Sequence, residues 1–189
     1  RLVNPNGRAL DLFGLIVAIH GDCAVIGVPF EDGPGSESGA AYVFRRQPLG
    51  WMLEQRLAPS DLRGDDRFGS ALAIDGERVF VSAFQRDIGG LRDVGAVLVF
   101  RRRNDEWLED TRLSPASPLE GDKFGASLSL NADELIMGVA PSAVYSDRPG
   151  FVLVFRNIQS TWIEEARLTA SDPTSYDGFG GTLASGGAW

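Results

Sequence analysis

A frame of aromatic and glycine anchors recurs in this chain at nearly constant spacing, and it constrains the fold more than any other feature. Four Phe-Gly pairs follow one another at steps of 55, 56 and 55 residues. These pairs are Phe13-Gly14, Phe68-Gly69, Phe124-Gly125 and Phe179-Gly180. A period of this length indicates that one supersecondary unit is repeated, and that each copy buries its hydrophobic face against its neighbours.

Four further anchors keep the same order in each of the three complete copies. They are Gly39-Ala40, Phe44, Trp51 and Leu57, then Gly95-Ala96, Phe100, Trp107 and Leu113, then Gly150-Phe151, Phe155, Trp162 and Leu168. The Phe precedes the Trp by 7 residues, the Trp precedes the Leu by 6, and the Leu precedes the next Phe-Gly by 11. Because large rings bury the most area, we expect the tryptophans to pack between copies. The alternative is that they stack against sugars.

The second copy predicts four short strands. Residues 70–74 and 79–83 are joined by a tight turn at Asp75-Gly76, and after a Gly-rich loop residues 95–101 and 107–113 form a second hairpin. No stretch has helical periodicity. Four strands per repeat are typical of a β-propeller blade. The predicted fold is all-β, a β-propeller segment of four-stranded antiparallel blades, with about three full blades and two partial ones.

The repeat divides residues 1–189 into units that do not coincide with the ends of the chain. The full repeats are expected at approximately 10–60, 65–116 and 121–171, with partial blades at 1–9 and 176–189. Propellers close with roughly 4 to 8 blades, so we expect this chain to be a segment of a longer protein. Self-association through the open blade edges is the alternative.

Composition excludes several classes of partner. The chain has 18 basic and 26 acidic residues, for a formal net charge of −8. This balance argues against nucleic acid and anionic membrane surfaces, which need a basic footprint. No apolar run approaches the roughly 20 residues that span a bilayer. Cys23 is the only cysteine, so no internal disulfide can form.

Two segments carry a resemblance to a known family. Gly121-Asp122-Lys123-Phe124-Gly125 and Gly39-Ala40-Ala41-Tyr42-Val43-Phe44 resemble the FG-GAP repeats of integrin α-subunit propellers, and still more closely the bacterial FG-GAP variant. A degraded "GAP" element is present at Gly27-Val28-Pro29 and Gly138-Val139-Ala140-Pro141. The resemblance covers essentially the whole chain. It implies a propeller of about seven blades, secreted or displayed on a bacterial cell surface, that binds a partner and is not an enzyme.

The chain departs from that resemblance at the turn between the first two strands of each copy. Integrin propellers carry calcium there on a longer loop of the Asp-x-Asp-x-Asp-Gly type, whereas this chain has only His20-Gly21, Asp75-Gly76 or Asn131-Ala132. A cation that needs about 6 to 8 oxygens cannot be wrapped by so short a turn. We therefore expect no integrin-type calcium site, no other metal site and no cofactor.

Acidic residues concentrate in the loops that an up-and-down blade places on one side. This loop face comprises residues 30–39, 58–67, 84–94, 114–123, 140–149 and 169–178, and it holds 13 acidic against 6 basic residues. Variable loops on a rigid scaffold are where binding function usually lies. The candidate binding residues are Glu31, Asp32, Asp65, Asp66, Asp93, Asp122, Asp147 and Asp177. The alternative is that the acidic loops only keep the protein soluble.

Two motifs in these loops have structural as well as functional interpretations. Asp65, Asp66, Asp122 and Asp177 precede the Phe-Gly pairs, where an aspartate accepts hydrogen bonds from nearby backbone N–H groups and fixes a turn. The alternative is a cation bound between blades. Arg63-Gly64-Asp65 spells the tripeptide that integrins recognise in their ligands. Because Gly-Asp belongs to the repeat frame, chance explains the motif, and an adhesive role requires an exposed and flexible loop.

The nucleophilic side chains do not form a catalytic set. His20, the sole histidine, occupies a hairpin turn, and Cys23 aligns with Arg78 and Glu134, which predicts a partly exposed thiol beside a turn. A nucleophile needs a base that a third group orients, and no such group is recognisable near His20. We expect no enzymatic activity.

Three functions from different classes remain open at this point. The first is a non-enzymatic, extracytoplasmic recognition or adhesion module that binds a protein partner through the loop face. The second is a carbohydrate-binding propeller, which requires exposed loop aromatics; the candidates are Phe30, Phe84, Tyr145 and Tyr176. The third is the scaffold part of a larger enzyme whose active site lies outside this segment.

Overall fold

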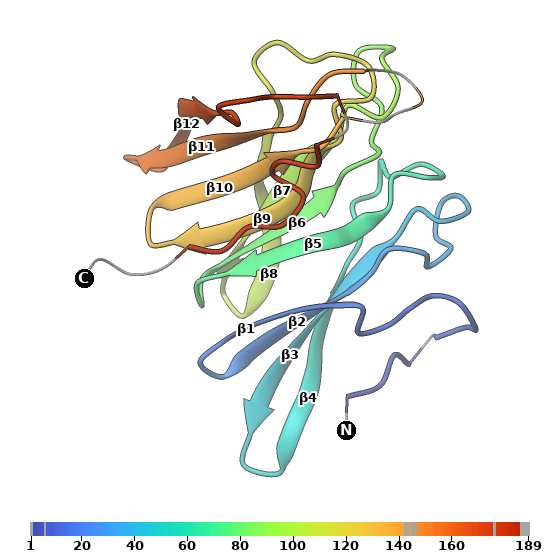
Figure 1. The fold of residues 1–189 in the computed structure, drawn as a ribbon. Helices are drawn as coiled ribbons and strands as arrows, with labels where there is room; N and C mark the ends of the chain where they lie inside the picture. Colours follow the sequence, from blue (N-terminus) through green and yellow to red (C-terminus); the bar gives the residue numbers. More distant parts are fainter. Residues whose placement is uncertain (1, 6, 142–143, 145–146, 176, 186–189) are drawn as a thin grey trace.

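A computed structural model shows three four-stranded antiparallel sheets that follow one another along the chain (Figure 1). It describes residues 2–5, 7–141, 144, 147–175 and 177–185. Blade 1 contains β1 (Ile16–His20), β2 (Cys23–Val28), β3 (Ala40–Gln47) and β4 (Gly50–Leu57). Blade 2 contains β5 (Phe68–Ile74), β6 (Arg78–Ala83), β7 (Ala96–Arg103) and β8 (Glu106–Leu113). Blade 3 contains β9 (Phe124–Asn131), β10 (Glu134–Val139), β11 (Phe151–Ile158) and β12 (Thr161–Leu168).

Each sheet is an up-and-down meander in which strands adjacent in sequence are paired. The tight turns that join them use residues with positive φ: Gly76 has φ +94° and Ala132 has φ +51°, so the second residue of each turn pair takes this conformation and not the Asp or Asn before it. Asn104 and Asp105 lie at +51° and +66° in the β7–β8 turn. The predicted all-β fold of propeller blades is confirmed. No helix that could span a membrane occurs in the described part of the chain.

The hydrophobic core lies between the blades. One cluster joins Val25, Val43 and Leu57 of blade 1 to blade 2, and a second joins blade 2 to Leu135, Met137 and further residues of blade 3. We call these contacts the first junction and the second junction. A sheet with two apolar faces must bury both, so the stacking of blades is the source of the core.

Two of the repeat's tryptophans, Trp107 and Trp162, pack between blades as predicted, whereas Trp51 does not. Trp107 of β8 is 2% exposed and belongs to the cluster of the first junction. Trp162 of β12 meets Phe80 of blade 2 edge to face, with ring centroids 5.3 Å apart. Trp51 packs against the outer face of blade 1, under the guanidinium of Arg46. The sugar-stacking alternative for Trp107 is therefore excluded by burial.

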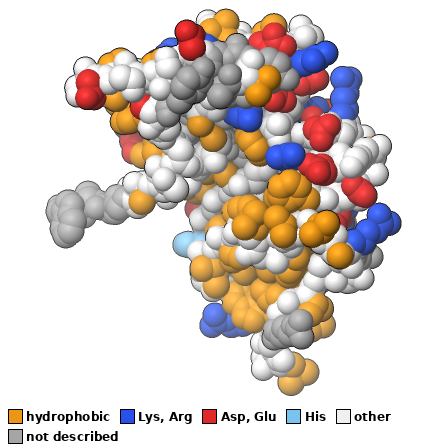
Figure 2. Space-filling view, turned by 45° about the vertical axis from the view of Figure 1, so that its right-hand side comes forward, with side chains coloured by type: hydrophobic (Ala, Val, Ile, Leu, Met, Phe, Trp, Pro, Cys, Tyr) orange, Lys and Arg blue, Asp and Glu red, His pale blue; other side chains and the backbone are white. Residues whose placement is uncertain are grey.

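The outer face of blade 1 is apolar and partly open. Ile26, Tyr42 and Phe44 form its centre, covered by Leu2 and Phe13, while Val17 and Ile19 of β1 are 56% and 58% exposed. Figure 2 shows hydrophobic side chains gathered over this blade. In blades 2 and 3 the equivalent faces are buried against the preceding blade.

The Phe-Gly pairs hold each blade to its predecessor by close backbone contact. Gly39 bridges Phe68 of the next blade in a parallel arrangement, and the N–H of Phe68 donates to the carbonyl of Ser38 at 3.0 Å. A Cβ at Gly39 would overlap the Phe68 carbonyl oxygen, and Gly95 and Gly150 stand in the same relation to the next Phe. Glycine is therefore required sterically at these positions.

Cys23 differs from its predicted placement. It is fully buried in the first junction, whereas its alignment with Arg78 and Glu134 predicts partial exposure. The side chain at this position starts between two blades. A long charged side chain extends from there to solvent, but a short thiol remains beneath its neighbours.

We predict that Gly39→Ala destabilises the fold by about 3 kcal/mol or more, because the methyl group meets the next blade's backbone and φ is +83°. Gly14→Ala is the matched control: its φ is +90°, but nothing lies within 4 Å of a Cβ there. The control should lose only about 1 kcal/mol. Urea unfolding of both variants separates steric overlap from φ strain, and equal losses would contradict the close-contact explanation.

Candidate functional site

The long connections of all three blades emerge on the same side of the molecule, away from the tight hairpin turns (Figure 1). They form the loop face predicted from the sequence. Acidic and basic side chains alternate over this side in the space-filling view (Figure 2). The opposite side, which we call the turn face, carries the β1–β2 and β3–β4 turns and their equivalents in blades 2 and 3.

A ladder of backbone hydrogen bonds ties the β2–β3 loop and the β6–β7 loop to the next blade. Asp65 N–H donates to the carbonyl of Ser36 at 2.9 Å, and Arg67 N–H to that of Glu37 at 3.2 Å. The same pattern recurs one blade later, at distances from 2.8 to 3.0 Å. Its bonds join Gly121 to Arg92, Lys123 to Asp93 and Phe124 to Val94. These two loops of the loop face are therefore held in fixed positions.

Aspartates two residues before Phe-Gly cap the turn that leads into each blade. The carboxylate of Asp66 accepts from Arg63 N–H at 3.0 Å, and that of Asp122 from Leu119 N–H at 2.7 Å. Asp177 does the same less closely, with Thr174 N–H at 3.3 Å. The turn interpretation is confirmed for these three residues.

Sequence reasoning missed a fourth member of this set. Asp11 is 5% exposed and accepts from Arg8 N–H at 2.6 Å. Its position two residues before Phe13 was the available signal. Asp65 differs from the set, because it is exposed, has φ +67° and joins the backbone ladder.

Arginines compensate the two most deeply buried of these carboxylates. Arg86 Nη1 lies 3.4 Å from Asp66, and Arg148 Nη1 lies 2.8 Å from Asp122. Burial raises the pKa of Asp66, although its hydrogen bond from Arg63 and the charge of Arg86 oppose this effect. These two aspartates therefore stabilise the loops from inside and are not available to a partner at the surface.

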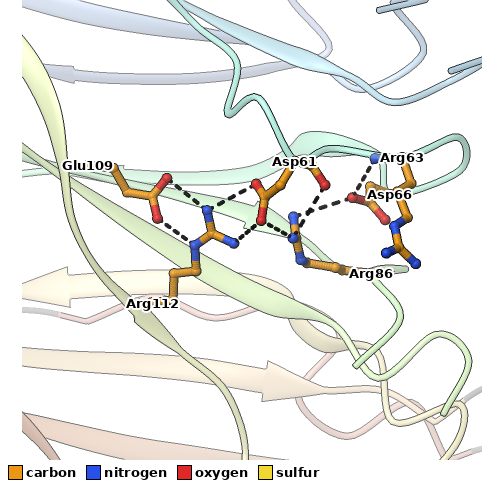
Figure 3. A network of polar contacts seen from close by, with 6 residues as sticks. All are labelled: Asp61, Arg63, Asp66, Arg86, Glu109 and Arg112. Atoms are coloured by element: carbon orange, nitrogen blue, oxygen red, sulfur yellow. Dashed lines mark hydrogen bonds and ion pairs between the residues drawn. The ribbon is translucent and has the colours of Figure 1, made fainter. Parts of the chain in front are cut away.

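A chain of alternating charges crosses blade 2 from β8 to the turn before β5 (Figure 3). Arg112 lies between Glu109 and Asp61, and its Nη1 is 2.5 Å from the Asp61 carboxylate. Asp61 also accepts from Arg86 Nη2 at 2.6 Å. The hydrogen bonds from Arg112, helped by the charge of Arg86, lower the pKa of Asp61 to about 2.

A cavity of about 300 Å³ opens beside this network. Its lining includes Asp66, Arg86, Asp87 and the turn residues Gly89 and Gly90. Arg63 also lines it, and Figure 3 shows the Arg63 guanidinium pointing away from the charge network, which it contacts through its backbone N–H. The cavity is polar and adjoins solvent-exposed carboxylates of the loop face.

Glu31 occupies the interior of blade 1 instead of its surface. It is 6% exposed, its Oε2 accepts from Tyr42 Oη at 2.8 Å, and Arg56 lies 2.7 Å from its Oε1. Asn4 donates to it as well, at 3.1 Å. Burial, followed by the hydrogen bond to Glu31, raises the pKa of Tyr42. Glu31 therefore fixes the loop that carries it.

The structure thus divides the eight candidate residues into two groups. Glu31, Asp66 and Asp122 are buried, and their carboxylates are engaged within the fold. The second group comprises the exposed residues Asp32, Asp65, Asp147 and Asp177 and the half-buried Asp93. Asp32 accepts from Glu37 N–H at 3.1 Å and Asp177 from Phe179 N–H at 2.9 Å, so these two side chains are also oriented by the backbone.

The Arg63-Gly64-Asp65 segment is exposed but tethered. All three residues are open to solvent, while the backbone N–H groups at both of its ends donate to fixed acceptors in Asp66 and Ser36. The segment also touches the preceding loop, where a Cβ at Gly35 would come 2.5 Å from Gly64 N. It meets the exposure condition for a displayed adhesive motif, and its backbone is held by the ladder.

The loop aromatics are engaged with cations. Phe30 and Phe84 are half-buried, with Arg67 4.9 Å and Lys123 5.6 Å from their ring centroids. Tyr145 and Tyr176, also named as candidates, lie outside the described residues. The described loops therefore present no open aromatic platform for a sugar.

Neither the cysteine nor the histidine is placed for nucleophilic chemistry. Burial raises the pKa of Cys23 to about 11, so its thiol is protonated at neutral pH. His20 lies exposed in the β1–β2 turn, against Gly76 of blade 2. Within the described ranges, no three His, Cys, Asp or Glu residues are grouped so that they could hold a metal ion.

The comparisons with known proteins agree with the repeat frame. The FG-GAP repeat family matches residues 1–44 and 51–100. These two segments contain the first two Phe-Gly pairs and the first two Gly-Ala pairs. The third copy keeps the same anchors and the same blade. A search of curated proteins found no significant match.

We predict that Asp61→Asn lowers stability in a pH-dependent way. The folded pKa of about 2 is below the ordinary 3.8, so the stabilisation is present above pH 3.8 and is lost as the pH falls through 2. Because the Asp61 side chain is 48% exposed, solvent screening limits the effect to below about 1 kcal/mol at neutral pH.

A double-mutant cycle of Asp61→Asn with Arg112→Gln, followed by chemical denaturation, measures this coupling directly. We expect a coupling free energy at pH 7 that disappears by about pH 2. A coupling that is independent of pH would show that the charge of Asp61 is not its source.

Proposed function

The chain belongs to the FG-GAP repeat family, and we propose that it is a non-enzymatic recognition or adhesion module that binds a protein partner through its loop face. The observation that carries this proposal is a set of exposed carboxylates on a surface fixed by backbone hydrogen bonds. The exposed set is Asp32, Asp65, Asp147 and Asp177, and Asp93 is half-buried on the same face. A surface that is already ordered loses little conformational entropy on binding.

Charge supports a partner with a basic surface. The loop face holds 13 acidic and 6 basic residues, so most of the net charge of −8 resides there. The acidic excess steers a basic partner toward this side and raises the association rate at low salt. The carboxylates are spread over the loops of three blades, and this spacing suits an extended protein surface better than a small ligand.

The chemistry of the nucleophilic side chains supports a binding role over catalysis. Cys23 is buried and protonated, and His20 belongs to the turn face, distant in the fold from the loop face. Buried carboxylates such as Asp122 are engaged with backbone N–H groups and arginines. Carboxylates enclosed by partners of the fold itself are not free to act as general acids or bases, and this supports a binding role.

We place this function outside the cytoplasm, on a cell surface or in a secreted protein. FG-GAP repeats are typical of extracellular proteins. A fold stabilised by apolar junctions and backbone ladders, with its thiol buried, suits an oxidising compartment, because no reactive thiol is offered to solvent.

We predict that Asp65→Asn combined with Asp93→Asn weakens partner binding at least tenfold at low salt, with little change in melting temperature. Asp65 is exposed and Asp93 is half-buried, and their φ values of +67° and +50° are ones that asparagine also adopts, so the loop should keep its shape. The loss should shrink as the salt concentration rises, because the interaction is electrostatic.

The matched control is Glu106→Gln combined with Glu164→Gln, which removes the same charge from exposed strand positions away from the loops. Immobilised chains are exposed to cell-surface protein extracts. We expect proteins retained by the unmodified chain and the control, but lost from the Asp65/Asp93 variant. Equal retention by both double variants would overturn the loop-face proposal.

A further inference from the structure

Two side chains of blade 1 form hydrogen bonds to the edge strand of blade 2 at the first junction. Gln55 Nε2 donates to the carbonyl of Trp107 at 2.8 Å, and Trp107 N–H donates back to Gln55 Oε1 at 2.8 Å. Glu54 accepts from Trp107 Nε1 at 3.4 Å and from Arg102 Nη2 at 2.8 Å. A carboxamide therefore satisfies the main chain of the tryptophan, and a carboxylate satisfies its indole.

A bulge in the last strand of blade 1 allows two adjacent side chains to act together. The β3–β4 register shifts between Val43 and Phe44, so that Glu54 is the additional residue beside Gln55. The same shift recurs in blade 2 between Val99 and Phe100. A bulge re-aims a side chain that would otherwise point to the opposite face of the strand.

Shorter side chains take these positions at the second junction. Asp110 and Thr111 replace Glu54 and Gln55 in the frame, and they face Trp162 of blade 3. Neither makes a hydrogen bond to Trp162 in the part of the chain that the structure describes. The hydrogen bonds that join the two blades at the first junction are therefore absent between these residues, although the tryptophan and the bulge are kept.

The shortening leaves buried polar atoms without partners. Arg45 Nε donates to Glu54 at 3.0 Å, but the equivalent Arg101 Nε lies 3.5 Å from Asp110 in poor alignment and is buried without a hydrogen bond among the described residues. Asn157 Oδ1, at the position of Arg102, is buried without a partner there as well, but it is an acceptor and needs a donor instead of a carboxylate. Such atoms cost free energy unless a ligand or water satisfies them.

An open groove results between the outer strands of blades 2 and 3. A cavity of about 380 Å³ is lined by Arg101, Asp110, Thr111 and Trp162, among others. A second cavity of about 260 Å³ adjoins it, since Arg101 lines both, and it reaches Asn157. Cavities of this size accommodate small polar ligands or a few side chains.

We propose that this groove binds a short peptide segment of another protein in which a glutamate directly precedes a glutamine. The first junction supplies the argument, because there a carboxamide satisfies the main chain of the equivalent Trp107 and a carboxylate satisfies its indole N–H. The carboxamide of the bound segment pairs with the main-chain N–H and carbonyl of Trp162. Its carboxylate accepts from Arg101 Nε and from the indole N–H. The site is separate from the loop face and does not depend on its function.

The probe is the tetrapeptide acetyl-Leu-Glu-Gln-Arg-amide, which copies residues 53–56 of the chain. The control peptide has Asp-Thr in place of Glu-Gln. Binding is followed by the indole N–H resonance of Trp162, assigned by its loss in Trp162→Phe. We expect saturable shifts of that resonance with a dissociation constant on the order of 1 mM, and at least tenfold weaker binding of the control peptide.

Filling the groove from within gives an independent test. The double variant Asp110→Glu/Thr111→Gln should reproduce the hydrogen bonds of the first junction. It should therefore raise the melting temperature and abolish binding of the tetrapeptide. The variant Glu54→Asp/Gln55→Thr should open an equivalent groove at the first junction, lower the melting temperature, and add a second binding event reported by Trp107.

Four results would overturn the proposal. The first is an unshifted Trp162 resonance at peptide concentrations well above 1 mM. The second is equal shifts from the tetrapeptide and its Asp-Thr control. The third is saturable binding of a sugar acid such as glucuronate without binding of the peptide, which would assign the groove to carbohydrates. The fourth is binding of the tetrapeptide by the Asp110→Glu/Thr111→Gln variant with the affinity of the unmodified chain, which would exclude this groove as the site.

Discussion

The close approach of a glycine in one blade to the Phe-Gly pair of the next is the contact on which the rest of the structure depends. Gly39 and Phe68 form a backbone bridge between blades 1 and 2, and Gly95 lies against Phe124 in the same way. Side chains at these positions would push the blades apart. Because main-chain atoms make the contact, its geometry is the same at each junction whatever the nearby side chains are. It fixes the spacing of the blades, and it starts the ladder that orders the loops.

Carboxylates of the loop face have two roles: some stabilise the turns beneath the ladder, and others are open to solvent. Asp66 and Asp122 cap turns from within and are neutralised by arginines, and they hold the loops in the conformation in which Asp65 projects to solvent and Asp93 is half-buried. A buried charge without such partners would be strongly destabilising. The acidic character of the loop face therefore has two physical origins, one that keeps the turns in place and one that is available to a partner.

The repeat frame was sufficient to predict the blades, their strand order and the packing of Trp107 and Trp162, because the anchors with fixed spacing are the residues that form the junctions. The repeat frame was not sufficient to predict which side chains of the loops are buried. Charge counting treated Glu31 and Asp66 as surface groups, since nothing in the sequence tells which loop carboxylates face an arginine across the blade. Cys23 was placed wrongly for a related reason, because alignment transfers the position of a backbone and not the length of a side chain. The fourth turn-capping residue, Asp11, was visible in the spacing and was overlooked.

Equal backbones with unequal side chains give the junctions different chemical properties. At the first junction, Glu54 and Gln55 reach across the gap and satisfy the edge of β8. At the second, one methylene fewer in Asp110 and the short Thr111 leave the edge of β12 open, with Arg101 Nε unsatisfied. Such truncation costs stability at one junction, but the backbone contact between Gly95 and Phe124 keeps the blades in register. A repeat architecture of this kind can therefore open a site at a single junction without disturbing the others, because the interblade spacing is set by glycines and not by the side chains that were lost.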